Sequence, residues 1–433
     1  MIRELTIAVA AFLVILAMLV PRKYLIVPFI LAACFVPTDQ RILVMGLNFT
    51  VLRVLVVIGL LRLAFQPKRI VRKWNNFDKM ITAWAICGAI IYCIQWGDTK
   101  AMINRSGVLF DILGLYLIFR ENLSSWENII FNFKVFAVCS IIMAVFVGIE
   151  YSTGSSPFIV LGKVTTELRE SRYRCQGSFP HSIMLGLFWA SLVPVLAVLA
   201  KTEKPKLLYV AGLAACTFIV IASASSTPVL VLVVVVAGLF VFNLRRYTGP
   251  VCLTMVGVFA IMHLVMKAPV WHLLARVNVV GGSTGWHRYY LIDKAIAHFG
   301  EWAVIGCRST AGWGTGLADI TNQFVLEGVR GGLITLFLFI IMLYMAFKII
   351  LNCSFRCETR NEKLLVWSFF VAMMGHCVGF LGVSYFGQIM MLFYMALAIV
   401  RFLSEYKPDM QPAFVKVFDE RPLHIRPELY SRF

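Results

Sequence analysis

The sequence predicts an all-α protein, a polytopic bundle of about twelve to thirteen transmembrane helices with a large outer-face loop that contains short amphipathic helices. The chain of 433 residues is 60% hydrophobic and only 14% charged, whereas about a quarter of the residues in soluble domains are charged. Apolar runs that approach the roughly 30 Å of a hydrocarbon core recur along the chain. No barrel-like alternation is present, so helices are the elements that can satisfy their backbone groups in lipid.

Thirteen apolar runs are expected to form the helices, and the first two are short enough to leave the count open. They lie at residues 5–20, 24–36, 42–61, 80–96, 107–119, 129–149, 183–200, 207–224, 227–244, 249–266, 323–351, 364–381 and 386–403. The first run lacks a convincing small-residue cleavage site and continues almost directly into the second. We therefore interpret it as a retained membrane helix and not as a secretory signal, and the side on which the N-terminus lies stays open.

Lysine and arginine gather in alternate connections, which sets the orientation of the helices. The connection 62–79 carries six of these residues and is expected on the cytoplasmic side. Alternation places three further basic connections there, namely 201–206, 245–250 and 352–363. We therefore expect residues 1–406 to form a single transmembrane domain, followed by a cytoplasmic C-terminal tail, 407–433.

The same alternation leaves two long polar loops outside, 150–182 and 267–322, and both are basic. Positive charge on the outer side opposes the usual insertion bias, so we expect it to serve binding, with a solvated loop surface as the alternative. In a membrane protein the net charge of +18 points to anionic lipid head groups and anionic lipid-linked substrates, and not to nucleic acid.

The segment Gly285 to Trp302 combines charged, imidazole and aromatic side chains in an otherwise apolar chain. Its central part has no glycine or proline and can form a helix, in which positions 288, 292, 295 and 299 share one face. Arg288 then lies on the apolar face, turned toward the bundle. A buried guanidinium needs a partner, which would be either a carboxylate or an anionic substrate.

Polar side chains also stand where the next membrane helix begins, at Asp319, Thr321, Asn322 and Gln323. The free amides and the positive dipole end of a helix N-terminus suit an anionic ligand. Simple N-capping by Asp319 or Thr321 is the alternative, and both roles can coexist.

In the first outer loop, Arg174 stands just before a Gly-x-Phe-Pro turn, Gly177 to Pro180, and His181 leads into a helix. This arrangement is typical of a charged group fixed at the membrane surface. An arginine that merely extends its head group toward water is the alternative.

These motifs resemble the O-antigen ligase and polymerase superfamily of bacterial inner-membrane proteins. The shared pattern is Arg-x-x-Gly-x-Phe before one helix, then Thr-Gly-x-x-Arg-Tyr-Tyr, a Gly-x-Gly turn, Asp-x-Thr-Asn and Gly-Gly-Leu, and it covers roughly residues 170–345. The resemblance implies a site on the periplasmic face that handles polysaccharide on undecaprenyl pyrophosphate. It also implies that Arg174 and Arg288 bind the pyrophosphate of the donor, and we add Arg172 as a further candidate.

The chain departs from the superfamily pattern in two places. Ligases often carry a His-Asn pair before the helix, whereas Thr321 precedes Asn322 here. Many relatives have a Ser-Arg pair where this chain has 223–231 without an arginine. The departures favour polymerisation over ligation.

The implied chemistry is an inverting glycosyl transfer without a metal or another cofactor. Arginines would neutralise the pyrophosphate leaving group, and a base would take the proton of the acceptor hydroxyl. Asp319 is the first candidate for the base, and His287 or His298 is the second. Asn322 completes the candidate catalytic set.

We therefore expect a polysaccharide polymerase, with an O-antigen ligase that transfers glycan to a lipid A core or another acceptor as the alternative. A transporter or flippase of lipid-linked sugars is the alternative from another class, although the paired interrupted helices typical of transporters are not evident. The expected partners are the undecaprenyl-pyrophosphate-linked oligosaccharide, a glycan acceptor, membrane lipids and other polysaccharide export components.

Two further pairs carry structural expectations. Arg53 and Asp111 are charged residues inside apolar runs, where charges are usually paired and often functional, so we expect either an ion pair between them or a role in binding substrate. Cys175 and Cys307 lie in the two outer loops and could form a disulfide bond in an oxidising compartment.

Overall fold

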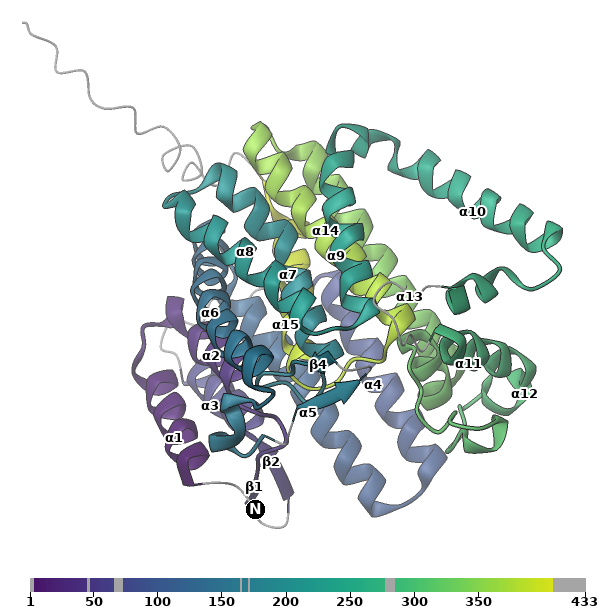
Figure 1. The fold of residues 1–433 in the computed structure, drawn as a ribbon, viewed down its shortest axis with the longest axis horizontal. Coiled ribbons are helices and arrows are strands. Elements are labelled where there is room, and N and C mark those ends of the chain that lie inside the picture. Colours follow the sequence, from purple (N-terminus) through teal and green to yellow (C-terminus); the bar gives the residue numbers. More distant parts are fainter. Residues whose placement is uncertain are drawn as a thin grey trace, which may run out of the picture.

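The computed structural model describes residues 4–44, 47–65, 73–163, 166–169, 172–276 and 285–407, which form a bundle of helices (Figure 1). The long elements are α1 Glu4–Leu19, α2 Ile26–Phe35, α3 Val51–Ala64, α4 Asn76–Trp96, α5 Thr99–Asn122, α6 Trp126–Thr153, α7 Ser182–Thr202, α8 Lys206–Ala222, α9 Ser226–Phe240, α10 Thr248–Val265, α13 Gln323–Arg356, α14 Arg360–Gly382 and α15 Gln388–Glu405. The fold is therefore all-α, as the sequence predicts.

Short elements connect these helices. They are the helices α11 Gly285–Ala297 and α12 Phe299–Trp302, the 3-10 turns η1 Arg22–Tyr24, η2 Pro157–Leu161, η3 Val241–Tyr247, η4 Val270–Arg276 and η5 Ala311–Trp313, and the strands β1 Arg41–Val44, β2 Leu47–Thr50, β3 Glu167–Arg169 and β4 Arg172–Arg174. The strands form two antiparallel hairpins, β1 with β2 and β3 with β4.

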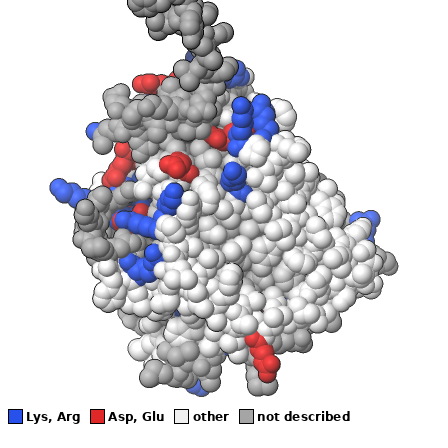
Figure 2. All heavy atoms as spheres, turned by 90° about the vertical axis from the view of Figure 1, so that its left-hand side faces the viewer, with Lys and Arg blue, Asp and Glu red and all other residues white. Residues whose placement is uncertain are grey.

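Eight helical segments of the described chain are long and apolar enough to cross a membrane, as expected of a multi-pass membrane protein. One of them, Ser226–Val251, runs from α9 through η3 into the start of α10. Most of the surface seen in Figure 2 carries no lysine, arginine, aspartate or glutamate, and the charged side chains gather toward its upper and left margins. A broad uncharged surface of this kind suits contact with lipid.

Each of the thirteen expected helices has a counterpart, but the expectation for 42–61 was wrong at its start. Residues 41–44 and 47–50 form the two strands of the β1–β2 hairpin, in which Arg41 pairs with Thr50. The Thr50 hydroxyl accepts a hydrogen bond from the backbone N–H of Arg53 at 3.2 Å, so Thr50 caps α3 and the helix begins only at Val51. Apolar β-branched and aromatic residues in this stretch suit a strand as well as a helix.

The helix expected at 107–119 is also longer than the hydropathy suggests. The side chain of Asp98 accepts a hydrogen bond from the backbone N–H of Ala101 at 2.6 Å, and α5 therefore starts at Thr99. This extension places Arg105 inside the helix instead of in a connection.

The strand hairpins, α11 and α12 lie toward one end of the bundle (Figure 1). We call this end the hairpin face and define it by the connections after α2, α4, α6, α8, α10 and α14. The turns between α7 and α8 and between α13 and α14 lie at the other end of the bundle, which we call the opposite face (Figure 1). The residues of the expected C-terminal tail, apart from Lys407, lie outside the described part of the chain.

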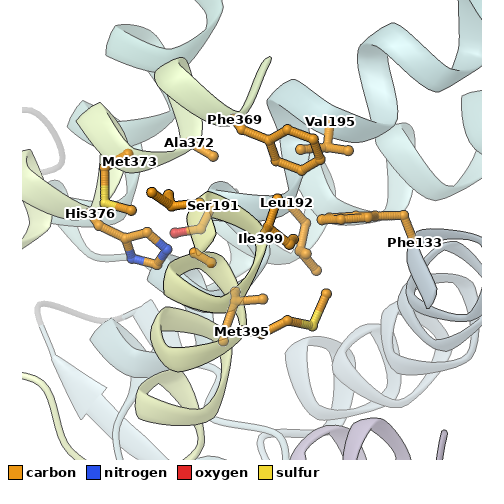
Figure 3. A pocket seen from close by; sticks show the side chains of 13 residues that line it. Phe133, Ser191, Leu192, Val195, Phe369, Ala372, Met373, His376, Met395 and Ile399 are labelled. Atoms are coloured by element: carbon orange, nitrogen blue, oxygen red, sulfur yellow. The ribbon is translucent and has the colours of Figure 1, made fainter. Parts of the chain in front are cut away.

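Helix α7 forms the centre of the bundle, where it packs against α8, α9 and α14. A small void of about 20 Å³ lies between α7, α14 and α15 and has largely apolar walls, as Figure 3 shows. A space of that size holds about one water molecule. The His376 imidazole borders the void, and its Nδ1 lies 3.1 Å from the Tyr385 hydroxyl. This part of the core is closely packed and offers no room for a ligand.

Helix α10 is different, because it stands apart from the rest of the bundle (Figure 1). It contacts mainly η3 and η4, and large apolar side chains such as Leu253 and Leu264 are exposed along it. Such a helix needs an apolar medium around most of its circumference.

A buried charge network near the opposite face joins α4, α5 and α15. The Asp78 side chain is fully buried and accepts hydrogen bonds from the Tyr116 hydroxyl at 2.7 Å, from Arg120 Nε at 2.8 Å and from Arg401 Nε at 2.9 Å. It also accepts a hydrogen bond from the backbone N–H of Asn75 at 2.9 Å, which completes a capping box at the start of α4. One carboxylate therefore holds three helices together.

We expect the Asp78→Asn substitution to lower the free energy of unfolding by about 3–5 kcal/mol, because it removes the fully buried carboxylate that Arg120 and Arg401 share. The two guanidinium groups then keep only the more exposed carboxylates of Glu121 and Glu405. Unfolding of the detergent-solubilised protein, followed by tryptophan fluorescence, measures the change. The control is Arg22→Gln, which breaks a partly exposed 3.8 Å ion pair with Glu121 and should cost less than about 1 kcal/mol. Equal losses in the two variants would contradict the role assigned to Asp78.

Candidate functional site

A cavity of about 450 Å³ opens near the hairpin face. We call it the arginine cavity, because four arginines line it, namely Arg41, Arg53, Arg105 and Arg330. Its other charged lining residues are Asp39, Asp111 and Glu327. Side chains of α3, α4, α5, α13 and α15 form its walls together with the β1–β2 hairpin and the connection between α14 and α15.

Arg53 and Asp111 form an ion pair in the wall of this cavity, which confirms the expected pairing. Arg53 donates from Nε to Asp111 Oδ1 at 2.9 Å and from Nη2 to Oδ2 at 2.5 Å. A guanidinium and a carboxylate joined by two parallel bonds form a strong and well-oriented pair. The pair joins α3 to α5, and these two groups neutralise each other.

Two other arginines of the cavity, Arg105 and Arg330, form no ion pair with any described side chain. The Arg105 guanidinium lies over the Tyr92 ring, 5.3 Å from its centroid. Arg105 is half-buried and Arg330 is exposed, and the only nearby opposite charge that acts on both among the described residues is the Glu327 carboxylate. Arginines within membrane helices that lack a direct ion pair usually serve a ligand or a pathway. They make this cavity a candidate site for an anion.

Glu327 faces the same cavity but is held by neutral groups. Its carboxylate accepts hydrogen bonds from Trp84 Nε1 at 2.9 Å and from Gln323 Nε2 at 2.8 Å. Gln323 in turn accepts a hydrogen bond from the backbone N–H of Tyr385 at 2.8 Å. This chain of contacts fixes the start of α13 against the connection that leads into α15.

A break interrupts α13 two residues after Arg330. Gly332 adopts φ 65° and ψ −171° inside the helix, a conformation that favours glycine. The segment 303–307 crosses the break and supplies hydrogen bonds that the helix loses. The backbone N–H of Leu333 donates to Ala303 O at 2.8 Å, and the N–H of Cys307 donates to Val329 O at 2.9 Å. We call residues 303–307 the strap.

A second cavity, of about 260 Å³, shares Leu326 and Arg330 with the arginine cavity. We call it the side cavity. It lies between the end of α4, the start of α13 and the connection that precedes α13. Asp319 is among its lining residues, so one member of the expected catalytic set borders a cavity beside the unpaired arginines.

Arg288 is buried in α11, as its place in the sequence predicts, with 8% of its surface exposed. Its Nε donates to the backbone carbonyl of Gly382 at 2.8 Å, and no described carboxylate pairs with it. Burial lowers the pKa of Arg288, although an arginine stays charged at neutral pH. The expected face is correct for Ala295, which is buried, but wrong for Phe299, because α11 ends at Ala297 and Phe299 is exposed.

Asn322 and Arg288 both form hydrogen bonds to the C-terminal end of α14. Asn322 Oδ1 accepts a hydrogen bond from the backbone N–H of Val325 at 3.1 Å and thereby caps α13, while Nδ2 donates to Leu381 O at 3.3 Å. The cap is therefore Asn322 and neither Asp319 nor Thr321. Arg288 and Asn322 hold the connection whose next residues, Ser384 and Tyr385, line the two cavities.

Arg174 is also buried, at the end of β4. It donates from Nη1 to Glu167 at 3.0 Å and from Nη2 to the Ser225 hydroxyl at 2.8 Å. Ser225 precedes α9, so Arg174 stands at the N-terminus of that helix. Arg172, two residues earlier, is exposed.

The two histidines of the expected catalytic set have partners within their own loop. His298 Nδ1 lies 2.7 Å from Glu301, and its ring stacks on Trp313. His287 Nε2 lies 3.4 Å from the backbone carbonyl of Asp319. Neither histidine lines one of the two cavities, so both contacts contribute to the packing of the loop.

Cys175 and Cys307 both carry free thiols, so the expected disulfide bond is absent. Cys175 is buried beside Val147 of α6, whereas Cys307 borders the side cavity. Burial raises the pKa of Cys175 to about 12 and also raises that of Cys307.

The sequence alone did not single out Arg41, Arg105, Arg330 or Glu327. Arg330 and Glu327 stand beside the Gly331–Gly332 pair in an otherwise apolar run, and charges inside such runs are a signal of function. Arg105 is placed within a helix only when α5 is known to begin at Thr99. Arg41 is placed at the cavity only by the β1–β2 hairpin.

Metal ligands do not gather in the described part of the chain, where no group of three or more His, Cys, Asp or Glu side chains could hold a metal ion. No protein-family model matches the sequence, and no curated protein matches it. The superfamily resemblance of the motifs stays a prediction.

His181 caps α7 in a way that depends on its protonation state. Its Nδ1 accepts a hydrogen bond from the backbone N–H of Ile183 at 3.2 Å, which requires the neutral ring. Burial lowers the pKa of His181, Arg174 and Lys163 lower it further, and Glu167 and Asp319 oppose them. The unfolded chain therefore takes up the proton more readily, so stability is full above the ordinary imidazole value of about 6.5 and falls as the pH drops below it.

We expect His181→Asn to keep the cap and to remove this pH dependence. Between pH 7.5 and pH 5.5 the native protein should lose roughly 1 kcal/mol more of its free energy of unfolding than the variant does. Parallel unfolding curves at the two pH values measure the difference. An identical pH dependence in both proteins would show that His181 does not carry it.

We expect Gly332→Ala to destabilise the protein by more than about 1 kcal/mol, because φ at this residue is positive and the new methyl group would overlap the Val304 carbonyl oxygen. Chemical unfolding in detergent measures the loss. The matched control is Gly300→Ala, where the methyl group would meet open space. If both variants are as stable as the native protein, the strap does not lie as closely against α13 as the structure places it.

Proposed function

We propose that this protein transfers glycan from an undecaprenyl-pyrophosphate-linked donor at the hairpin face, and that this face is the periplasmic side of a bacterial inner membrane. The single observation that carries the proposal is the pair of unpaired arginines, Arg105 and Arg330, in the wall of the 450 Å³ arginine cavity. Guanidinium groups bind phosphate oxygens through paired hydrogen bonds. The cavity lies within a bundle whose apolar surface gives a lipid-linked substrate a route from the membrane.

The proposed orientation follows from the distribution of positive charge. Basic connections such as 201–206 and 352–363 lie at the opposite face, where the positive-inside rule would place the cytoplasm. The hairpin face then lies outside, where nucleotide sugars are not available, and the donor has to carry its own activated leaving group. We also propose that all thirteen helices, including the short ones, span the membrane.

In the proposed reaction, an acceptor hydroxyl attacks the anomeric carbon of the donor and the bond from that carbon to the pyrophosphate oxygen breaks. The anomeric configuration inverts, undecaprenyl pyrophosphate leaves, and the hydroxyl proton passes to a base. Asp319 is the favoured base because its carboxylate lines the side cavity and has no hydrogen-bonded partner among the described residues. Arg105 and Arg330 would stabilise the charge that develops on the leaving group.

In this proposal Arg174 and Arg288 hold the structure around the cavities and do not contact the leaving group. Both are buried near helix ends, and Arg288 fixes the end of α14 through Gly382. Arg288 would then act by holding the connection that borders both cavities, and direct contact with pyrophosphate is the alternative that the motif resemblance implies. Polymerisation is favoured over ligation because the chain lacks the His-Asn pair before α13.

Transfer is tested with purified protein in proteoliposomes, an undecaprenyl-pyrophosphate oligosaccharide and candidate acceptors. We expect Arg330→Gln to lower the rate of transfer by roughly 10²–10³-fold, because one contact to the developing charge is lost. The matched control is Arg360→Gln, an exposed arginine of the opposite face, which should leave the rate unchanged. Gel analysis of the lipid-linked products gives the chain length.

The outcomes separate the candidate functions. Longer lipid-linked chains indicate a polymerase, and glycan on another acceptor indicates a ligase. Movement of the lipid-linked sugar across the bilayer without a new glycosidic bond would replace the proposal by a transporter. Full activity of Arg330→Gln would remove the arginine cavity from the mechanism.

A further inference from the structure

The side cavity is lined by aromatic rings and neutral polar groups, which a phosphate group does not need for binding. Two aromatic side chains of α4, Tyr92 and Trp96, lie on one of its walls, four residues apart, with their ring centroids separated by 5.8 Å. Both rings are only partly buried. Partly exposed aromatic rings beside polar groups are typical of a wall against which the C–H face of a sugar ring packs.

Gln95 supplies a second and independent observation. Its side chain is 7% exposed, and its Nε2 donates to the backbone carbonyls of Ile305 and Val329 at 3.1 Å and 3.3 Å. Since both neighbours are acceptors, the amide nitrogen has to face them and the orientation of the amide is fixed. Gln95 Oε1 is then a buried acceptor with no hydrogen-bond partner among the described residues, and Gln95 lines the side cavity.

A buried acceptor without a partner is unfavourable by about 1–3 kcal/mol. The atom is closed off from the cavity as the side chain stands, so a ligand hydroxyl would satisfy it once the Gln95 amide shifts toward the cavity. Further polar groups line the same space, among them the Asp319 carboxylate and the side chains of Arg308, Ser309 and Ser384. Aromatic faces combined with several separate donors and acceptors fit a polyhydroxylated ligand better than they fit an apolar one.

The loop that closes the cavity is anchored to α4. Arg308 donates from Nε to Gln95 O at 2.8 Å and from Nη2 to Trp96 O at 3.3 Å, so its positive charge lies at the C-terminal end of that helix, where a cation is favourable. The volume of about 260 Å³ lies just below the roughly 300 Å³ at which ligand pockets begin. The cavity therefore suits one sugar unit and not a long oligosaccharide.

We propose that the side cavity binds a terminal sugar unit, with its ring packed on Tyr92 and Trp96 and one hydroxyl donating to Gln95 Oε1. In terms of the proposed function, on which this assignment to the acceptor rests, the sugar is the end of the acceptor glycan. Arg330 and Leu326 separate it from the arginine cavity, so the attacking hydroxyl and the leaving pyrophosphate would meet across this shared wall, beside Asp319.

Binding is tested apart from catalysis by saturation-transfer NMR on the detergent-solubilised protein, with a panel of methyl glycosides of common hexoses and hexuronic acids as probes. We expect at least one glycoside to receive saturation on its ring protons with an affinity in the millimolar range. Trp96→Ala should weaken this binding at least tenfold because the packing surface is lost, and Gln95→Met should weaken it about tenfold because the acceptor is lost.

The matched control is Trp286→Ala, which removes an equally large but more exposed aromatic side chain of the hairpin face. Trp286 lines neither cavity, so binding should be unchanged. Gel filtration and circular dichroism establish that each variant is folded. Thr310→Ser gives a milder second probe of the cavity wall, because it keeps the hydroxyl that donates to Leu317 O and should retain binding. No binding of any glycoside to the native protein, or equal binding to native protein, Trp96→Ala and Gln95→Met, would overturn the proposal.

The same variants separate this inference from the proposed function. If glycosides bind as expected but no glycan is transferred, the sugar site stands and the proposed function fails. If glycan is transferred and Trp96→Ala leaves the KM for the acceptor unchanged, the proposed function stands and the side cavity is not the acceptor site.

Discussion

The pairing of Asp78 with Arg120 and Arg401 is the interaction on which the arrangement of the candidate site depends. The carboxylate joins the ends of α4, α5 and α15 near the opposite face, and the same three helices carry Trp84, Arg105 and Tyr394 in the wall of the arginine cavity. A hydrocarbon surrounding contributes little force that drives helices together. Buried hydrogen-bonded charges supply a directional contact that fixes which helices are neighbours.

Near the hairpin face, the helices are held in a different way. There the contacts are mostly between side chains and backbone carbonyls at helix ends, as for Arg288 with Gly382 and Asn322 with Leu381. Carbonyls at the ends of helices have no partner within the helix, so an arginine or an asparagine can satisfy them. The hairpin face is therefore assembled from helix termini, and the two cavities lie where these termini leave room.

Much of the fold follows from the sequence, because apolar runs of membrane length predict helices whatever their neighbours are. The predicted burial of Arg288 is confirmed, and of the two alternatives for Arg53 and Asp111 the ion pair is the one present. The misplaced elements are those in which local capping outweighs hydropathy, as at Thr50 and Asp98. Arg105 and Arg330 meet only through the tertiary structure, and no periodicity along the chain could have brought them together.

The strap has a consequence for how the chain can be divided. Ala303 and Cys307 complete the backbone hydrogen bonds of α13, so the strap is part of the helix bundle itself and not an appendage to it. A chimera that exchanges this segment for that of another protein would leave α13 with open backbone groups at Gly332. The strap precedes α13 in the chain, so it is already synthesised when α13 emerges, and α13 can complete its backbone hydrogen bonds as soon as the two segments dock.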